Sequence, residues 1–310
     1  MSLESVDSGS GMRKRRAAGV IGLGAMGMGV ARSLLRAGFE THGYDLRREA
    51  RDTLQAEGGI ASATAAEVGA ACNVVLVIVV NAAQADEVLF GPAGALSSMR
   101  DGSVVLLCST VAPEFAEVLG SRLAEHRILM IDAPLSGGVA KSASGQLTVM
   151  AAGDPKAFEI ADEALAAIAT KVYRLGERPG AGSRVKMINQ LLAGVHIAVA
   201  AEAVALGLKA GVDPATLYDV ISNSAVSSWM FQNRVPHILA GDYQPLSAVS
   251  IFVKDLGIVL DAARKASFPL PLTAAAHQMF LMATAGGHGS EDDSAVIKIF
   301  PGIELPAKAI

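Results

Sequence analysis

The sequence predicts an α/β domain followed by an all-α domain, and three observations lead to this fold class. Short apolar runs alternate with helically periodic segments up to about residue 175, glycines cluster after the first of these runs, and no convincing strand occurs after residue 178. A chain of 310 residues is long enough for about two domains. We therefore expect a disordered tail over residues 1–16, an α/β domain over 17–178 and an all-helical domain over 179–310.

The composition is that of a folded and weakly charged globular protein. Hydrophobic residues make up 51% of the chain, charged residues make up 18%, and the formal net charge is -4. Such a chain is too apolar for intrinsic disorder and has no basic stripe to hold nucleic acid. Aromatic residues are only 5%, so aliphatic side chains fill the core, which favours buried strands covered by helices. No nucleic-acid partner is expected.

The cysteines and the N-terminal charges bear on the cellular compartment. Cys72 and Cys108 are too few for a disulfide framework and are flanked by apolar or small residues. The basic run at residues 13–16 imitates a signal peptide, but the closely spaced glycines that follow it suit a turn better than an apolar helix. We therefore expect a cytoplasmic protein.

No membrane-spanning or metal-binding segment is expected. The apolar stretch at residues 191–208 is interrupted by His196 and Glu202. We expect both of these polar side chains to be satisfied core groups. The histidines and cysteines show no metal-ligand spacing, so no metal site is predicted.

The first half of the chain alternates strands and helices. The expected strands lie at residues 19–22, 41–44, 73–80, 103–107, 128–131, 147–151 and 172–175. The expected helices between them include residues 30–37, 50–57, 114–125 and 157–168. Gly38 and Gly58 directly follow two of these helices, as is typical of helix ends. Strands that alternate with helices predict a parallel sheet.

The second half shows only helical periodicity. Residues 185–209 form a long run that is apolar nearly all round, which predicts a helix buried on most sides. Asp213 and Pro214 are residue types that begin helices, and residues 248–265 and 272–285 continue the helical pattern. The long run should be the spine of the second domain.

The glycine cluster carries the first sign of chemistry. A G-x-G-x-x-G pattern lies between an expected strand and an expected helix, and Asp45 lies at the end of the next strand. The pattern consists of Gly22, Leu23, Gly24, Ala25, Met26 and Gly27. The three glycines allow a tight turn, a close approach to a pyrophosphate and close packing of helix on strand, while the helix N-terminus attracts phosphate. The pattern therefore predicts a Rossmann-type dinucleotide site in which Asp45 binds a ribose diol. Arg47 and Arg48 could hold a 2′-phosphate, but Asp45 would repel it, so NAD is expected rather than NADP.

Three further motifs identify a family. They are DAPLSGG at residues 132–138, GAGSRVKMINQ at 180–190 and KDL at 254–256. Together with the glycine pattern they resemble the β-hydroxyacid dehydrogenases, which include 3-hydroxyisobutyrate dehydrogenase and tartronate semialdehyde reductase, and the likeness runs from Ala18 to about Pro306. The segments that are more narrowly similar to the L-threonate dehydrogenase branch are residues 190–197, 228–231 and 291–298.

The resemblance implies an NAD-dependent enzyme that oxidises a small hydroxy acid in a cleft between its two domains, with Lys186 as the acid/base group. The other site residues that it implies are Ser136, Gly137 and Gly138 for the substrate carboxylate, Asn189 or Gln190 for substrate orientation, and Ser109, Thr110 and Lys254 beside the nicotinamide. In the L-threonate branch the product would be 2-oxo-tetronate. The alternatives are tartronate semialdehyde reduction, 3-hydroxyisobutyrate oxidation and, in a different class, a non-catalytic dinucleotide sensor.

The sequence context of Lys186 agrees independently with an acid/base role. If its helix begins near Gly182, Lys186 lies within or just past the first turn, where the helix dipole disfavours a cation. Partial burial and an oxidised nicotinamide nearby would lower the pKa of Lys186 further toward neutrality. Asn189 and Gln190 share its helix face.

Two assignments stay open from the residues alone. Ser136, Gly137 and Gly138 offer a hydroxyl and backbone N–H groups to a carboxylate, but a Ser-Gly-Gly segment is equally a flexible turn. Lys254 lies on the polar face of its helix, where a lysine is ordinarily just solvated.

The large apolar helical domain also predicts a homodimer or homotetramer.

Overall fold

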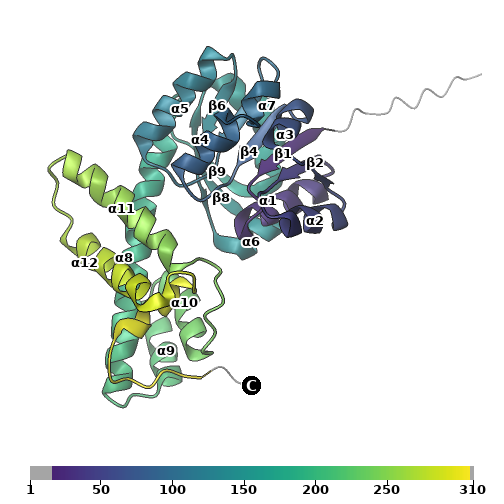
Figure 1. Cartoon of the computed structure of the whole chain (residues 1–310). Coiled ribbons are helices and arrows are strands. Elements are labelled where there is room, and N and C mark those ends of the chain that lie inside the picture. Colours follow the sequence, from purple (N-terminus) through teal and green to yellow (C-terminus); the bar gives the residue numbers. More distant parts are fainter. Residues whose placement is uncertain (1–15, 308–310) are drawn as a thin grey trace, which may run out of the picture.

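The computed structural model describes residues 16–307; residues 1–15 and 308–310, and with them nearly all of the predicted tail, lie outside the described residues. The chain builds a sheet-containing half and a helical half, joined by one long helix (Figure 1). The predicted α/β then all-α order is confirmed.

Nine strands form the sheet of the first half. They are β1 (Ala17–Ile21), β2 (Glu40–Tyr44), β3 (Ile60–Ala61), β4 (Val74–Val77), β5 (Val104–Leu107), β6 (Leu129–Asp132), β7 (Leu135–Ser136), β8 (Leu147–Gly153) and β9 (Ala169–Arg174). Their order is β3-β2-β1-β4-β5-β6-β8-β7, with β9 also paired to β8. Gly19 of β1 lies in register with His42 of β2 and Val75 of β4, and the pairs from β3 to β6 are all parallel.

The predicted parallel sheet is present from β3 to β6, and its other end contains an antiparallel strand that was not predicted. Strand β8 runs antiparallel to both β6 and β7. After β6 the chain passes directly into β7, and one short helix then returns it along the sheet, so no long crossover carries it back to the parallel direction. Strands β3 and β7 have two residues each, too few for an alternating pattern to reveal them.

Helices cover both faces of the sheet. They are α1 (Ala25–Arg36), α2 (Arg48–Ala56), α3 (Ala65–Ala71), α4 (Ala82–Phe90), α5 (Pro113–Glu125), α6 (Gly138–Ser144) and α7 (Pro155–Ile168). One apolar core lies on the α1 and α7 side, and a second lies on the side of α3, α4 and α5. Gly38 and Gly58, which the sequence placed at helix ends, have positive φ, as that role requires.

The helical half is built around α8 (Ala181–Lys209). The other helices are α9 (Pro214–Ser222), α10 (Trp229–Leu239), α11 (Val249–Lys265), α12 (Pro271–Ala283) and the short 3₁₀ segment η3 (Asp293–Ile299). Asp213 caps α9 by accepting from the Thr216 N–H, as its sequence position predicted. A third core joins α8 to α10, α11, α12 and η3.

Helix α8 differs from its prediction in two ways. It is long and apolar enough to cross a membrane by length and composition, although no such segment was expected, and 44% of its most apolar window is buried inside the fold. Its first turns contact β6, β8 and α5, and the rest packs among the helices of the second half, so it is the core helix that joins the two halves. One face is nevertheless exposed, and Glu202 lies on it rather than in the core.

Candidate active site

The glycine turn lies between β1 and α1, at the carboxyl end of the sheet. Gly22 has a φ of +96° and donates its N–H to the Tyr44 carbonyl, so the turn is anchored to β2. A Cβ on Gly27 would lie 1.8 Å from the Gly22 carbonyl oxygen, which only glycine avoids. A Cβ on Gly24 would meet no protein atom within 4 Å, so glycine at this position leaves space in front of the turn. Gly24 is the N-cap of α1 and no side chain caps that end, which leaves the helix N-terminus available to an anion.

Asp45 directly follows β2 and binds the backbone of the glycine turn. One carboxylate oxygen accepts the Leu23 N–H at 2.8 Å, and the other accepts the Arg47 N–H at 2.9 Å. The Arg47 guanidinium also donates to this carboxylate and to the Leu23 carbonyl. Burial opposes these contacts, but together they hold the pKa of Asp45 below its usual value. Asp45 is therefore an anion beside the glycine turn, with Arg47 folded over it.

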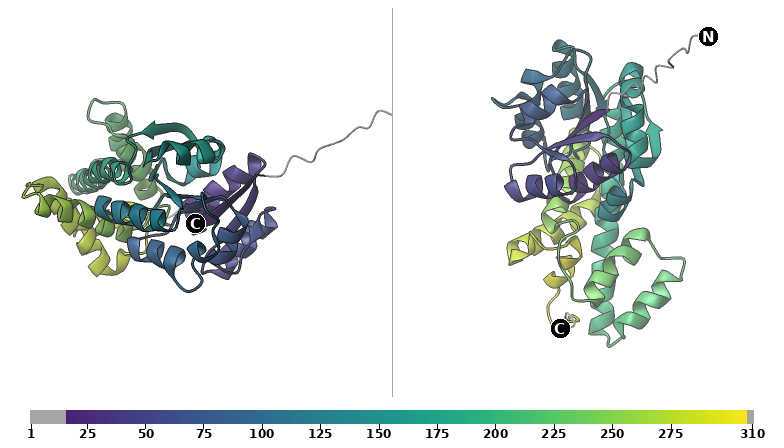
Figure 2. Two further views of the ribbon diagram at one scale, coloured as in Figure 1. Left: turned by 90° about the horizontal axis from the view of Figure 1, so that it is seen from above. Right: turned by 90° about the vertical axis from the view of Figure 1, so that its right-hand side faces the viewer.

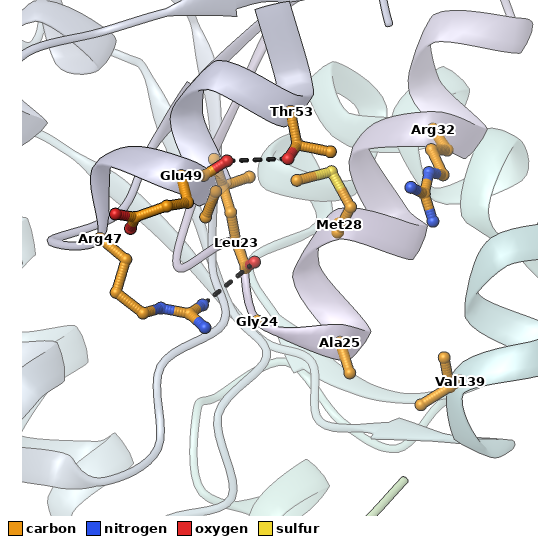
Figure 3. A pocket seen from close by; sticks show the side chains of 10 residues that line it. Leu23, Gly24, Ala25, Met28, Arg32, Arg47, Glu49, Thr53 and Val139 are labelled. Atoms are coloured by element: carbon orange, nitrogen blue, oxygen red, sulfur yellow. Dashed lines mark hydrogen bonds between the residues drawn. The ribbon is translucent and has the colours of Figure 1, made fainter. Parts of the chain in front are cut away.

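A pocket of about 410 Å³ opens in front of the glycine turn (Figure 3). Its lining comes from the turn, α1, the start of α2 and one residue of α6, and comprises Leu23, Gly24, Ala25, Met28, Arg32, Arg47, Glu49, Ala50, Thr53 and Val139. No motif marks six of these residues, and only the fold brings them to the turn; they are Met28, Arg32, Glu49, Ala50, Thr53 and Val139. Free N–H groups, an anionic Asp45 and unfilled space suit the adenosine and pyrophosphate of NAD.

The three residues expected beside the nicotinamide, Ser109, Thr110 and Lys254, make different contacts within the protein. Ser109 is buried, and its hydroxyl accepts the Val79 N–H and donates to the Val77 carbonyl, so its hydrogen bonds are made within the sheet. The Thr110 carbonyl accepts from the Lys254 ammonium at 3.0 Å. Lys254 is therefore no solvated surface lysine: it reaches from α11 to the loop after β5 and ties the two halves together.

Ser136 and the two glycines after it lie where β7 passes into α6. Gly137 has a φ of +136° and is the N-cap of α6, and Gly138 has a φ of +73°. A Cβ on Gly137 would approach Lys141 and Leu147 to within 3.0 and 3.3 Å, whereas a Cβ on Gly138 would enter open space. The positive φ angles favour glycine at both positions, and no side chain caps the N-terminus of α6.

Lys186 lies in the second turn of α8 and is only 7% exposed. Burial is the largest effect on its titration and Lys254 adds to it, while Asp255 opposes both, and the pKa of Lys186 falls to about 8. Within residues 16–307 its ammonium has no hydrogen-bond partner. A lysine that is buried, unpaired and half neutral near pH 8 is suited to accept and return a proton.

Asn189 and Gln190 follow Lys186 on the same helix face but have different environments. The Gln190 amide donates to Asp255 at 2.6 Å, and Asp255 also pairs with Lys254. Among the described residues, the Asn189 amide has no such contact. Of the two, Asn189 is thus free for a ligand and Gln190 belongs to a polar network with Asp255 and Lys254. Asp255 belongs to the KDL motif, but no role was predicted for it; it is buried and bonded to both other members of this network.

Comparisons with known proteins agree over nearly the whole chain. Residues 17–176 match a family model described as the NAD binding domain of 6-phosphogluconate dehydrogenase, and residues 180–300 match one described as NAD-binding of NADP-dependent 3-hydroxyisobutyrate dehydrogenase. The chain is 65% identical to an L-threonate dehydrogenase of Cupriavidus necator over 291 residues, which are 94% of this chain and 98% of the relative. It is 51% identical to an L-threonate dehydrogenase of Escherichia coli K12, over 93% of this chain and 96% of the relative. A crystal structure of a 3-hydroxyisobutyrate dehydrogenase from Salmonella typhimurium superposes with a TM-score of 0.88 at 50% identity, covering 92% of this chain and all of that one.

Proposed function

The chain belongs to the β-hydroxyacid dehydrogenase family, and from this premise we propose that it oxidises L-threonate to 2-oxo-tetronate with NAD⁺. Relatives that carry the name L-threonate dehydrogenase match almost the full length of the chain at 50–65% identity, which supports this substrate over the other hydroxy acids of the family. The observation that carries the proposal is Lys186: a buried amine with a lowered pKa, on one helix face with the unpaired Asn189 amide.

The mechanism follows from the chemistry of these side chains. NAD⁺, when bound at the glycine turn, supplies the hydride acceptor. Lys186 in its neutral form takes the proton of the substrate hydroxyl while the carbinol carbon loses its hydride, leaving a ketone and an ammonium group. In the reverse direction the same ammonium returns the proton to the carbonyl oxygen.

The remaining residues hold the substrate in place. We assign the carboxylate to the Ser136 hydroxyl and the backbone N–H groups of Gly137 and Gly138, because these groups lie at an uncapped helix end. We assign a substrate hydroxyl to Asn189, which has a free amide, rather than to Gln190, whose amide is bound to Asp255. Lys254, held between Thr110 and Asp255, closes the nicotinamide side.

A substrate panel tests the proposal. NADH formation is followed with L-threonate, D-threonate and 3-hydroxyisobutyrate, each with NAD⁺ and with NADP⁺, and NADH consumption is followed with tartronate semialdehyde. We expect the highest kcat/KM with L-threonate and NAD⁺. A higher kcat/KM with another acid would identify that acid as the substrate instead of L-threonate. Tight NADH binding without turnover of any acid would favour the dinucleotide sensor.

We also propose that the protein is a homo-oligomer in which α8 packs against a second copy. Exposed apolar side chains follow one face of α8 at intervals of three, four and seven residues; this α8 stripe consists of Val185, Ile188, Leu192, Val199 and Leu206. The spacing is that of a coiled-coil seam and extends over about 30 Å of helix. The side of α8 that packs against α11 and α12 is buried. The right-hand view of Figure 2 shows the sheet-containing half above the helical half that α8 joins to it.

The choice of a second copy follows from the shape of the stripe. A narrow helical seam of this length is matched best by another helix with an equal seam, and each copy of this chain supplies one. An apolar surface of that length exposed to water is unusual for a monomer. Val199, in the middle of the stripe, is 56% exposed.

The cytoplasm remains the compartment that we propose. Cys72 and Cys108 are buried free thiols, and burial raises the pKa of Cys72 to about 12. Such thiols need no oxidising compartment and are inert packing groups.

A further inference from the structure

Asp132, at the end of β6, is fully buried and makes its hydrogen bonds to another element. One carboxylate oxygen accepts the N–H groups of Gly180 and Ser183, each at 2.8 Å, and the other accepts the Ser183 hydroxyl at 2.7 Å. Gly180 is the N-cap of α8 and has no side chain to cap the helix. Asp132 therefore supplies from the sheet the cap that α8 lacks, where a carboxylate also complements the helix dipole.

The start of α8 is pressed against the sheet at the same place. A Cβ on Gly182 would lie 2.3 Å from the Met150 carbonyl oxygen and 2.6 Å from that of Asp132. The first turn of α8 thus touches the backbone of β6 and β8 directly. Contact of this kind, together with three hydrogen bonds to one carboxylate, leaves the turn little freedom to slide or rotate.

Asp132 lies between the two groups that must face the substrate. Ser183 is one helical turn before Lys186, so the hydrogen bonds to Asp132 hold the base of the turn that carries the lysine. On its other side the chain runs from Asp132 through Ala133 and Pro134 to Ser136. The same buried residue is therefore bonded to the helix of Lys186 and is close in sequence to the proposed carboxylate-binding turn.

We propose that Asp132 is a positioning residue, which fixes the first turn of α8 to the end of β6 and so sets Lys186 relative to Ser136 and Gly137. The inference rests on the proposed function for the meaning of that placement. Asp132 acts through geometry, because the charged groups that act on Lys186 are Asp255 and Lys254 of α11. Burial raises the pKa of Asp132 while its three hydrogen bonds oppose that rise.

The geometric role makes asparagine a conservative replacement. The amide oxygen of Asp132→Asn can accept the two N–H groups, and its NH₂ can donate to the Ser183 hydroxyl, which accepts as well as donates. Asp132→Ala removes all three contacts. Ser183→Ala removes only the hydroxyl contact and keeps the backbone ones. Ser33→Ala is the matched control, because it also removes a buried hydrogen bond, from the Ser33 hydroxyl to the Ser142 carbonyl, away from α8.

The experiment measures the position of Lys186 without substrate and with it. The full-length variants are labelled with trace acetic anhydride between pH 6 and 11, and the reaction of Lys186 is quantified by peptide mass spectrometry. Steady-state kinetics with L-threonate and NADH affinity are measured on the same samples. In the wild type we expect a labelling midpoint near pH 8.

The expected results separate positioning from stability. Asp132→Ala should move the midpoint toward the ordinary lysine value and lower kcat by about 10²-fold, the cost of a misplacement of roughly 1 Å, with NADH affinity unchanged. Asp132→Asn should keep the labelling midpoint of the wild type and a kcat within a few-fold of the wild-type value. Ser183→Ala should shift the midpoint and lower kcat in the same direction as Asp132→Ala, but by less. Ser33→Ala should lower the Tm and leave midpoint and kcat unchanged.

Other results overturn the inference. If Asp132→Ala and Ser183→Ala keep the wild-type midpoint and kcat, Asp132 is only a structural cap. If Asp132→Ala does not fold, Ser183→Ala decides by the same two readouts. If the wild type turns over no hydroxy acid while the midpoints shift as expected, the proposed function is wrong and the placement of Lys186 by Asp132 stands.

Discussion

Lys186 shows how one residue acquires its chemistry from its surroundings. From the sequence, we expect the helix dipole, partial burial and a nearby nicotinamide to lower the pKa of Lys186. In the fold the lysine is buried beneath the junction of the two halves, and burial is the largest effect on its pKa. Asp255 opposes that effect and keeps the pKa near 8, whereas Lys254 lowers it further.

Replacing Lys186 tests this balance. Lys186→Met should lower kcat by about 10² to 10⁴-fold, the usual contribution of a positioned proton-transfer group, while Lys156→Met, at an exposed position of α7, should leave it unchanged. The wild-type kcat/KM for oxidation should rise with pH and level off above about 8, because only the neutral amine accepts the proton. Near-wild-type turnover by folded Lys186→Met would contradict the assignment.

The same substitution has a predicted effect on stability. The pKa of Lys186 is about 8 when folded and near 10.4 when unfolded, so between these pH values the unfolded chain binds more protons and wild-type stability rises with pH. Below pH 8 the full cost of burying the charge is present, about 3 kcal/mol at most. Lys186→Met should therefore be more stable than wild type at pH 7, and thermal unfolding should show the gain shrinking toward pH 10. An equal gain at both pH values would argue against a buried charge.

Asp45 is the residue that we expect to select the cofactor. Its carboxylate would repel a 2′-phosphate and is occupied by Arg47, so Asp45→Ala removes the repulsion and also releases the guanidinium. The ratio of kcat/KM with NAD⁺ to that with NADP⁺ should fall by about tenfold or more. Asp162→Ala, at an exposed position of α7, is the control. A wild-type preference for NADP⁺ would mean that Arg47 and Arg48 dominate the site.

At the scale of elements, the start of α1 separates glycines needed for folding from a glycine needed for binding. Gly27 packs against the Gly22 carbonyl, whereas Gly24 faces open space with a φ of -66° that any residue can adopt. The two glycines belong to one motif and are indistinguishable by sequence, yet only one of them is required by the protein's own atoms.

A matched pair of alanine variants tests this distinction. Gly27→Ala should lower the Tm, because its Cβ would lie within 2 Å of a backbone oxygen. Gly24→Ala should keep the wild-type Tm and weaken NADH binding by about tenfold, because its Cβ occupies the space that the pyrophosphate approaches. Titration calorimetry and thermal unfolding measure both effects. NADH binding by Gly24→Ala with wild-type affinity would place the cofactor elsewhere.

At the scale of the whole molecule, α8 has three roles at once. Its first turns carry Lys186 and are bound to the sheet, one side forms the core of the helical half, and the α8 stripe remains exposed. The junction between the halves is further held by Lys254, which reaches the Thr110 carbonyl. A second copy on the stripe would bury the apolar face without disturbing either junction.

The oligomeric state tests the role of the stripe. Val199→Glu should reduce the mass measured by light scattering to that of a smaller assembly, because it introduces a charge into the middle of an apolar seam. Leu272→Glu is the control, since Leu272 is 72% exposed on α12 and lies outside the stripe. If Val199→Glu keeps the wild-type mass, the α8 stripe is not an interface between copies.

Local patterns were enough to predict the order of elements and to name candidate site residues. The glycine turn, Asp45 and the helix starting at Asp213 were predictable because each depends on a few neighbouring residues whose backbone conformation or capping is dictated locally. The family likeness extended this to Lys186 and the Ser136 turn, because its motifs are contiguous in the chain.

Contacts between distant segments were decided only by the tertiary structure. Four features depend on residues far apart in the sequence. They are the antiparallel direction of β8, the burial of Lys186, the hydrogen bond that distinguishes Gln190 from Asn189, and the hydrogen bonds of Asp132 to α8. Burial and hydrogen bonding depend on which surfaces meet, and a pattern of neighbours along the chain carries no information about the partner. For the same reason the periodicity of α8 revealed an apolar helix but not that one of its faces would be left exposed.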